Sequence, residues 1–233
     1  MTMPPESVLR DASLLVTGGT GAFGRAFVQR ALDDGARRVV VLSRDEAKQA
    51  ALRATVTDER VRWFVGDVRD FERVRWAMRG CDTVVHAAAM KRVDSCESDP
   101  QEAIDTNITG TGHVARAAIR EGVTRAVLLS TDKAASPSTL YGLTKSCAER
   151  LWVQSNAYAA GTPTRLAATR YGNTRSDSFD ARAGGDVIDL WSGPIGVSFG
   201  TEWRRDFKLG CSAGFGFDIP RQHLHLPRWC FVY

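Results

Sequence analysis

Short, largely continuous apolar segments alternate with longer helical patterns over most of the chain. The apolar segments are LLVTG, VVVLS, VRWFVGD, TVVHAAA and AVLLSTD, and helical patterns follow from about Gly24 and over 46–54, 71–79 and 100–120. A strand that is apolar on both faces is buried on both, as in a parallel sheet with helices on each side and right-handed crossovers. The sequence therefore predicts an α/β fold built on a doubly wound parallel sheet of the Rossmann type.

The periodic pattern ends near Asn173. Before it, a helix is predicted from Tyr141 to about Ala160, and LAATRYGN is predicted as one more strand with its exit loop. Residues 174–233 carry glycines and three tryptophans without a sustained period. We therefore expect a Rossmann domain over 1–173 that holds the catalytic residues, followed over 174–233 by a divergent tail or a partial substrate lobe.

Basic and acidic side chains are nearly balanced, 31 against 27, and no long run of like charge occurs. Electrostatics alone thus gives no reason to propose nucleic acid as a partner. The N-terminus has no basic region followed by a long apolar run, and no apolar stretch approaches the roughly 20 residues that span a bilayer. We expect a cytoplasmic protein with neither a signal peptide nor a membrane segment.

Cysteines and histidines form no recognisable ligand pattern. The five cysteines are odd in number and contain no CxxC pair, which argues against a disulfide framework and a zinc site. His223 and His225 lack a third partner, so no metal site is expected. Free thiols in a reducing compartment are the simpler interpretation of Cys81, Cys96, Cys147, Cys211 and Cys230.

A glycine-rich segment, TGGTGAFG, joins the first predicted strand to the first predicted helix. It spaces Gly18, Gly21 and Gly24 as GxxGxxG, so backbone N–H groups and the helix N-terminus can meet a pyrophosphate without obstruction by side chains. A merely tight turn would not need all three glycines. The position between strand and helix therefore favours a dinucleotide site.

The end of the second strand bears on the choice of dinucleotide. An enzyme that selects NAD usually has an acidic residue there, whereas this chain has Ser43 and Arg44 first. An arginine suits a 2'-phosphate, so we favour NADP, although Asp45 leaves NAD open and a surface arginine is the alternative. By fold position, Asp67 and Val68 would line the adenine, and 87–89 would allow close passage of the cofactor.

Tyr141 and Lys145 lie four residues apart at the start of a predicted helix, so their side chains share a face. An ammonium beside a phenol favours the phenolate, which would make the tyrosine a usable base near neutral pH. A YxxxK pair is often only a surface pair. After a nucleotide loop and a strand that ends in Ser130 and Thr131, it indicates hydride chemistry on an alcohol or a ketone.

Two charged residues, Asp132 and Lys133, follow that strand end. A simple dehydrogenase or epimerase needs only a hydroxyl there, whereas an acid and a base could act on the carbons beside an oxidised one. A solvated charge pair in a loop is the alternative.

Together these segments resemble a known family. TGGTGAFG, LSRDEAKQ, FVGDVRD, VVHAAAMKRVDSCESDPQEAIDTNITGT, LLSTDKAASPSTLYGLTK and TRYGN, which extend over about three quarters of the chain, resemble the motifs of the inverting UDP-N-acetylglucosamine 4,6-dehydratases. These are extended short-chain dehydrogenases/reductases of bacterial surface-sugar pathways. The STDKA block distinguishes them from the sugar-nucleotide epimerases, which remain an alternative beside a reductase and an inactive NADP-binding remnant.

The resemblance implies roles for the catalytic residues. Tyr141 would take the proton of the sugar 4-hydroxyl while NADP accepts hydride from carbon 4, with Lys145 on the nicotinamide ribose and Thr131 on the sugar oxygen. Lys133 would remove the proton at carbon 5, and Asp132 would protonate the departing 6-hydroxyl. Hydride then returns to carbon 6, and reprotonation inverts carbon 5.

Further expectations complete the site. Lys91 and Asn173 are candidates for contacts with the UDP-sugar substrate, Asn107 is a candidate for support of the active-site backbone, and relatives commonly form homo-oligomers. Family members continue beyond RYGN with a substrate lobe, so a disrupted reading frame, a truncated gene or a shortened enzyme with a compact lid would explain residues 174–233. The residues assigned to cofactor binding are Gly18, Thr20, Gly21, Phe23, Gly24, Ser43, Arg44, Lys48, Asp67, Val68, Ala87, Ala88, Tyr141 and Lys145.

Overall fold

A computed structural model describes residues 7–172 of the chain. Six strands form one sheet: β1 (Ser13–Thr17), β2 (Arg38–Ser43), β3 (Val61–Val65), β4 (Thr83–His86), β5 (Arg125–Thr131) and β6 (Arg165–Tyr171). The α-helices are α1 (Ala22–Asp33), α2 (Glu46–Thr55), α3 (Phe71–Met78), α4 (Val93–Ser98), α5 (Pro100–Ile104), α6 (Gly110–Glu121) and α7 (Leu140–Tyr158). A π-helical turn, Asp105–Thr109, joins α5 to α6, and a 3-10 turn, Asp132–Ala134, follows β5.

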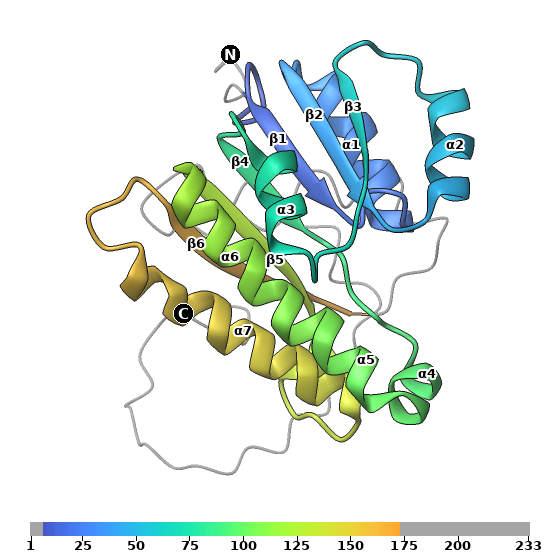
Figure 1. Ribbon diagram of the computed structural model, residues 1–233, viewed down its shortest axis with the longest axis vertical. Coiled ribbons are helices and arrows are strands. Elements are labelled where there is room, and N and C mark those ends of the chain that lie inside the picture. The colour runs from blue at the N-terminus through green and yellow to red at the C-terminus, as the bar shows by residue number, and fades with distance from the viewer. Residues whose placement is uncertain (1–6, 173–233) are drawn as a thin grey trace, which may run out of the picture.

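The six strands are all parallel, in the order β3-β2-β1-β4-β5-β6 (Figure 1). The predicted α/β fold with a doubly wound parallel sheet is confirmed. In this order the strand sequence reverses between β1 and β4, and the crevice beyond the carboxyl ends of these two strands is where ligands bind in such sheets.

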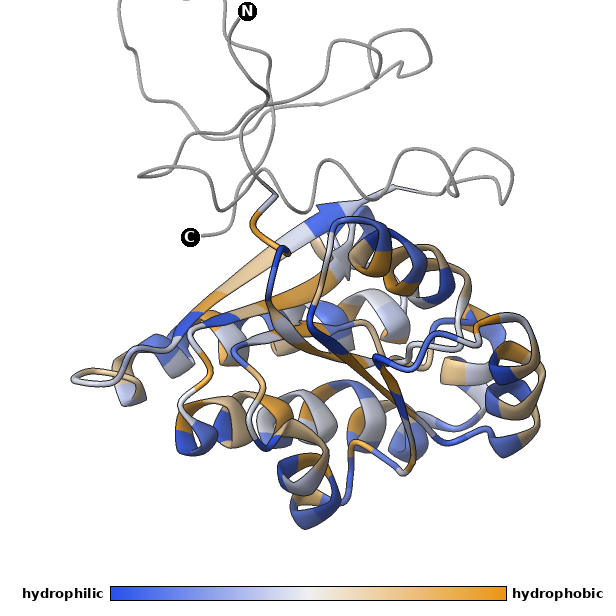
Figure 2. Cartoon of the chain, turned by 90° about the horizontal axis from the view of Figure 1, so that it is seen from above, coloured by the Kyte–Doolittle hydropathy of each residue, from blue (hydrophilic) through white to orange (hydrophobic). Residues whose placement is uncertain are grey.

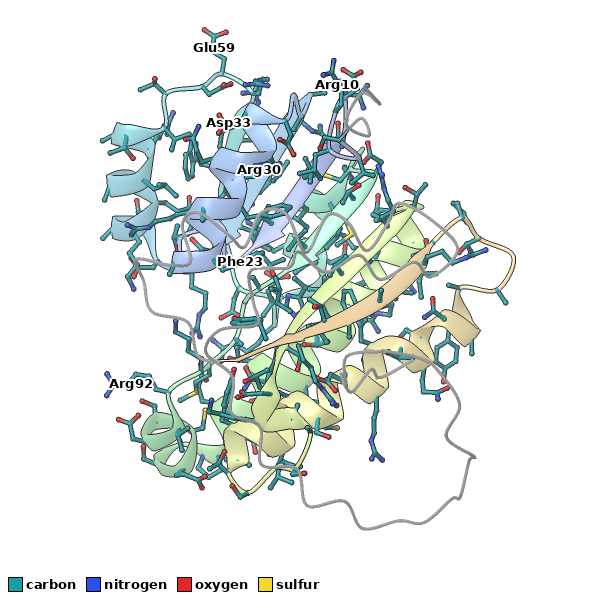
Figure 3. All side chains as sticks on the ribbon, turned by 180° about the vertical axis from the view of Figure 1, so that it is seen from behind. Arg10, Phe23, Arg30, Asp33, Glu59 and Arg92 are labelled. Atoms are coloured by element: carbon teal, nitrogen blue, oxygen red, sulfur yellow. The ribbon has the colours of Figure 1, made fainter. Side chains whose placement is uncertain are left out.

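The four inner strands are buried on both faces, as the continuous apolar segments predict. Leu14 and Leu15 of β1 point to opposite faces, and both are fully inaccessible to solvent. Leu14 belongs to a core that is packed under α1, whereas Leu15 belongs to a core under α3, α6 and α7. Figure 2 shows hydrophilic residues on the outer sides of the helices, and Figure 3 shows Arg30 and Asp33 on the outer side of α1.

The chain from Pro100 to Glu121 differs from the single long helix that the periodicity predicts. The helical path is continuous, but it contains the π-helical turn, which accommodates one extra residue per turn. The extra residue shifts the apolar positions by only one place in the sequence, so the pattern does not reveal it. The short helix α4 was not predicted either, because its sequence VDSCES is polar and spans fewer than two turns.

Residues 174–233, with the tryptophans, both histidines of the HxH pair, Cys211 and Cys230, lie outside the described residues, so the domain boundary stays a prediction. Within 7–172, Cys81, Cys96 and Cys147 are free thiols, and this part holds no group of three or more potential metal ligands. No helix in it is long and apolar enough to cross a membrane.

The loop between β1 and α1 and the first turn of α1 are packed closely, and at Gly18 and Gly24 a side chain would collide with backbone atoms. A Cβ at Gly18, where φ is +67°, would lie 2.8 Å from the Ala88 nitrogen in the loop after β4. A Cβ at Gly24 would lie 2.4 Å from the Cα of Gly19. The glycines therefore let the loops after β1 and β4 meet, and they let α1 start directly against its own loop.

We predict that Gly24→Ala lowers the free energy of unfolding by about 2 kcal/mol or more, because backbone atoms would have to shift. Gly21→Ala is the matched control: its φ is −72° and the nearest atom to its Cβ, the Gly18 oxygen, lies 3.3 Å away. It should cost about 1 kcal/mol or less. Urea unfolding followed by tryptophan fluorescence measures both, and equal losses would contradict the packing argument.

Candidate active site

The N-terminus of α1 faces the carboxyl edge of the sheet without a capping side chain. Gly21 occupies the N-cap position, no side chain accepts a hydrogen bond from the first turn, and that turn has no acidic residue. By contrast, Asp45, Asp70 and Thr139 cap α2, α3 and α7. An uncapped helix start beside a glycine loop leaves N–H donors for an anion, so these residues fit the pyrophosphate of a dinucleotide.

Two residues of the predicted cofactor set contribute to the core instead of the surface of this loop. The side chains of Thr20 and Phe23 are buried, and Phe23 stacks on Phe27 with ring centroids 5.5 Å apart. The ring of Phe23 belongs to the core under α1, and the cofactor roles of both residues stay predictions. Ala87 and Ala88 are half-buried, and the amide of Ala88 donates to the Thr17 hydroxyl at 3.2 Å.

Arg44, at the end of β2, meets acidic residues from two other segments. Its Nη1 lies 2.9 Å from Glu102 Oε1 and 3.7 Å from Asp67 Oδ2. Arg69 contacts the same two carboxylates, each at 2.6 Å. Burial raises the pKa of Asp67, but hydrogen bonds from Arg69 outweigh it and hold that pKa below the ordinary value. The sequence indicated Arg44 and Asp67 but gave no sign of Glu102 and Arg69.

The other predicted residues at this edge bond to nearby parts of the chain. Ser43 is buried and its hydroxyl accepts a hydrogen bond from Gln49 Nε2 at 2.9 Å, while the same nitrogen donates to the Phe64 carbonyl at 2.7 Å. Lys48 pairs with Asp45 at 2.9 Å, and Val68 is buried. Gln49, which sequence reasoning missed, thus joins the ends of β2 and β3.

A chain of buried hydrogen bonds runs from the glycine loop to the π-helical turn through His86. The Thr111 hydroxyl donates to the Asn107 carbonyl at 2.6 Å, so it must accept from His86 Nε2, which lies 3.0 Å away. Nδ1 is then the acceptor, and the Thr17 hydroxyl donates a hydrogen bond to it, with 2.6 Å between the oxygen and the nitrogen. Burial, with the charge of Lys145 as a second cause, lowers the pKa of His86 to about 3, so the ring is neutral.

Asn107 fixes the backbone that follows β4. Its Oδ1 accepts from the Met90 amide at 2.8 Å, and its Nδ2 donates to the Met90 carbonyl at 2.9 Å and to Thr144 Oγ1 at 3.0 Å. This geometry is what support of the active-site backbone requires. Lys91, the next residue after Met90, is exposed beside it, and Asn173 lies outside the described residues.

The five predicted catalytic residues come from the end of β5 and the start of α7. Asp132 Oδ1 accepts the Thr131 hydroxyl at 2.9 Å and lies 3.4 Å from Lys133 Nζ. The Thr131 side chain also lies close enough to Tyr141 to lower the pKa of the phenol. The structure thus brings Thr131, Asp132, Lys133 and Tyr141 together.

Lys145 differs from the sequence expectation in its direct partner. Its ammonium is buried and donates to the Leu129 carbonyl at 2.7 Å instead of acting on the phenol. Burial lowers its pKa to about 8, against the charge of Glu149, which raises it. Burial is also the main cause that raises the pKa of Tyr141 to about 12, and the Thr131 side chain offsets only part of it. Lys145 is not among the main causes that act on the pKa of Tyr141, so its predicted effect on the phenol stays a prediction.

Glu149, one turn beyond Lys145, is a buried carboxylate that the sequence did not single out. It is 1% exposed in its side chain and is paired with Arg170 of β6, with hydrogen bonds of 2.6–3.1 Å from Nε and Nη2. This pair joins the catalytic helix to the last strand. Its signal in the sequence is an acid four residues after the lysine, on the same face of the helix.

Comparison with known proteins places the chain in a family. A family model described as polysaccharide biosynthesis protein matches residues 14–192. The chain belongs to the polysaccharide biosynthesis protein family. It is 44% identical over 162 residues to the inverting UDP-N-acetylglucosamine 4,6-dehydratase of Campylobacter jejuni, covering 69% of this chain and 48% of that protein. The motif resemblance is thereby confirmed at the level of the family.

Other relatives include an epimerase. The chain is 39% identical over 189 residues to the UDP-glucose 4-epimerase of Rickettsia rickettsii, covering 79% of this chain and 54% of that one. Among solved structures, Pen from Bacillus thuringiensis has a TM-score of 0.70 and 38% identity, over 71% of this chain and 52% of its own. DesIV, a dTDP-glucose 4,6-dehydratase from Streptomyces venezuelae with NAD bound, has a TM-score of 0.63 and 28% identity, over 68% and 55%. The chain spans about half the length of the curated relatives that it matches.

We predict that buried His86 makes folding stability depend on pH. The pKa of His86 is about 3 in the folded chain, and its ordinary value is 6.5. Between these two pH values the unfolded chain binds a proton at His86, whereas the folded chain does not. Stability is therefore complete above pH 6.5 and falls as the pH drops toward 3, by up to about 1.4 kcal/mol per pH unit.

Urea unfolding of the wild type and of His86→Gln at pH 7, 6, 5 and 4 measures this slope. The variant should be less stable at pH 7 but should lose less stability per pH unit than the wild type. His113→Gln, which replaces the other histidine of residues 7–172, is the control and should keep the wild-type slope. An unchanged slope in His86→Gln would contradict the assignment.

Proposed function

We propose that this chain carries the cofactor-binding and proton-transfer residues of a cytoplasmic, NADP-dependent 4,6-dehydratase that acts on a UDP-N-acetylhexosamine and inverts carbon 5, in surface-polysaccharide biosynthesis. The observation that carries the proposal is the acid–base pair beside the tyrosine: Lys133 Nζ lies 3.4 Å from Asp132 Oδ1, and Thr131 contacts both Asp132 and Tyr141. Oxidation of an alcohol needs the tyrosine alone, whereas loss of water from neighbouring carbons needs an acid and a base as well.

The dinucleotide supplies the hydride acceptor and donor. It would be held by the uncapped start of α1, the glycine loop and the basic residues after β2. The related structure of DesIV contains NAD. In this chain the Arg44 side chain favours NADP, because a guanidinium group suits the 2'-phosphate.

The side chains of this site divide the proton transfers among them. Tyr141 takes the proton of the sugar 4-hydroxyl, and the carbonyl that forms at carbon 4 acidifies the proton on carbon 5. Lys133 removes that proton, and Asp132 protonates the 6-hydroxyl, which leaves as water. The hydride lost from carbon 4 would return to carbon 6, so the sum is the loss of one water molecule with no net oxidation, and return of a proton to the opposite face of carbon 5 gives inversion.

An epimerase is the second candidate, because the Rickettsia rickettsii relative is a UDP-glucose 4-epimerase. Epimerisation returns hydride to carbon 4 and leaves the hydroxyl at carbon 6. It gives Asp132 and Lys133 no proton to move, so the two reactions differ in their products and in their need for this pair.

Proton NMR of UDP-N-acetylglucosamine with the purified chain and NADP+ in deuterium oxide tests the proposal. We expect a 6-methyl signal, a 4-ketone or its hydrate, and deuterium at carbon 5. Lys133→Met should reduce the rate of all three by about 100-fold or more, since proton transfer by a positioned group contributes 10²–10⁴-fold. Arg150→Met, which removes an exposed positive charge from the outer side of α7, is the control and should react at the wild-type rate.

Each other outcome points to a different function. A 4-epimer without a methyl signal would establish the epimerase. NADP+ binding without any conversion would favour the inactive NADP-binding remnant. A methyl product from Lys133→Met at the wild-type rate would remove the lysine from the mechanism.

A further inference from the structure

Four charged side chains form a cluster at the carboxyl ends of β2 and β3. Arg44 follows β2, Asp67 and Arg69 follow β3, and Glu102 comes from α5, 58 residues after Arg44. Asp67 has the lowest side-chain exposure of the four at 22%, and Arg44 has the highest at 49%. The cluster is thus open to solvent on one side and adjoins the candidate dinucleotide site.

Glu102 bridges the two guanidinium groups. Its Oε1 accepts from Arg44 Nη1 at 2.9 Å, and its Oε2 accepts from Arg69 Nη1 at 2.6 Å. Guanidinium groups bind phosphate oxygens through the same charge-assisted N–H bonds. The carboxylate therefore holds the donors that a phosphate group at this place would use.

The two arginines do not depend on Glu102 to the same extent. Arg69 also holds Asp67 through Nε at 3.0 Å and Nη2 at 2.6 Å. Arg44 reaches Asp67 only at 3.7 Å, so its close partner is Glu102. Loss of Glu102 from the cluster would leave Arg69 neutralised by Asp67 and would expose the charge of Arg44.

The charges of the cluster balance one another. Two arginines face two carboxylates, so a 2'-phosphate added beside Arg44 would meet a cluster with no net positive charge to receive it. Lys48, the next cation along the chain, is itself paired with Asp45 at 2.9 Å. The ribose of NAD carries only hydroxyl groups at this place, so it meets no such repulsion.

We propose that Glu102 is a specificity-determining residue, whose carboxylate competes with the cofactor 2'-phosphate for Arg44 and so limits the preference of this chain for NADP over NAD. The inference rests on the proposed function only in that a nicotinamide dinucleotide binds at this edge. It does not depend on which sugar is converted or on whether any sugar is.

Binding constants for NADP+ and NAD+, measured by isothermal titration calorimetry on the whole chain, test the proposal. Glu102→Gln keeps the size of the side chain and one acceptor oxygen, and it removes the charge. It should tighten NADP+ binding by about two- to five-fold, the range for one exposed ion pair, and change NAD+ binding by less than about 1.5-fold. The gain should shrink at 0.5 M salt, because exposed charges are screened.

Two further variants make the result specific. Glu72→Gln removes an exposed carboxylate that pairs with Arg75 on α3, away from the cluster, and should leave both constants unchanged. Arg44→Met should weaken NADP+ binding, and adding Glu102→Gln to it should give little further gain, because the competed group is already gone.

Several results would overturn the inference. Weaker NADP+ binding by Glu102→Gln would mean that the carboxylate positions Arg44 for the phosphate, and equal changes for both dinucleotides would mean that it does not discriminate. Binding of neither dinucleotide by the wild type would refute the inference and the dinucleotide site together. NADP+ binding with no dehydration would refute only the proposed reaction.

Discussion

The arrangement of the whole carboxyl edge depends on the contact between the loop after β1 and the loop after β4. At Gly18 there is no room for one methyl group, since its Cβ would lie 2.8 Å from the Ala88 nitrogen. Thr17 and His86, at the ends of these same strands, are joined by a buried hydrogen bond. The loops after β1 and β4 are therefore packed tightly where the strand order reverses. This contact fixes the start of α1 and the segment after β4 relative to each other.

From this contact the site extends through two kinds of interaction. Beside β4, the interior is held by neutral groups: His86 donates to Thr111, which in turn donates to the Asn107 carbonyl. The surface beside it is held by ion pairs, of which Arg44 with Glu102 is one. Buried neutral bonds are costly to break because a donor would be left unsatisfied, whereas exposed pairs are weak and exchange readily. The framework is thus rigid where Met90 is held and adaptable where a cofactor phosphate would enter.

Local pattern predicted the parts of this protein that depend on neighbours in sequence. The strands follow from apolar runs, and the first two helices follow from helical patterns that begin near Gly24 and at Glu46; the structure adds that Asp45 caps α2. The sequence did not reveal which distant groups pair. Glu102 pairs with Arg44, which lies 58 residues earlier in the chain. The ammonium of Lys145 donates to the Leu129 carbonyl and not to the Tyr141 phenol. Partner choice of this kind is set by tertiary packing, which a period of two or 3.6 residues does not encode.

The raised pKa of Tyr141 and the lowered pKa of Lys145 have one cause, since burial disfavours the charged form of each. For the tyrosine this has two opposite effects. With a pKa of about 12, little phenolate is present near neutral pH, but that phenolate is a stronger base and lies closer in basicity to a sugar hydroxyl, which is a very weak acid. The Thr131 hydroxyl, which contacts Tyr141 and also Asp132, is the group that offsets part of this cost.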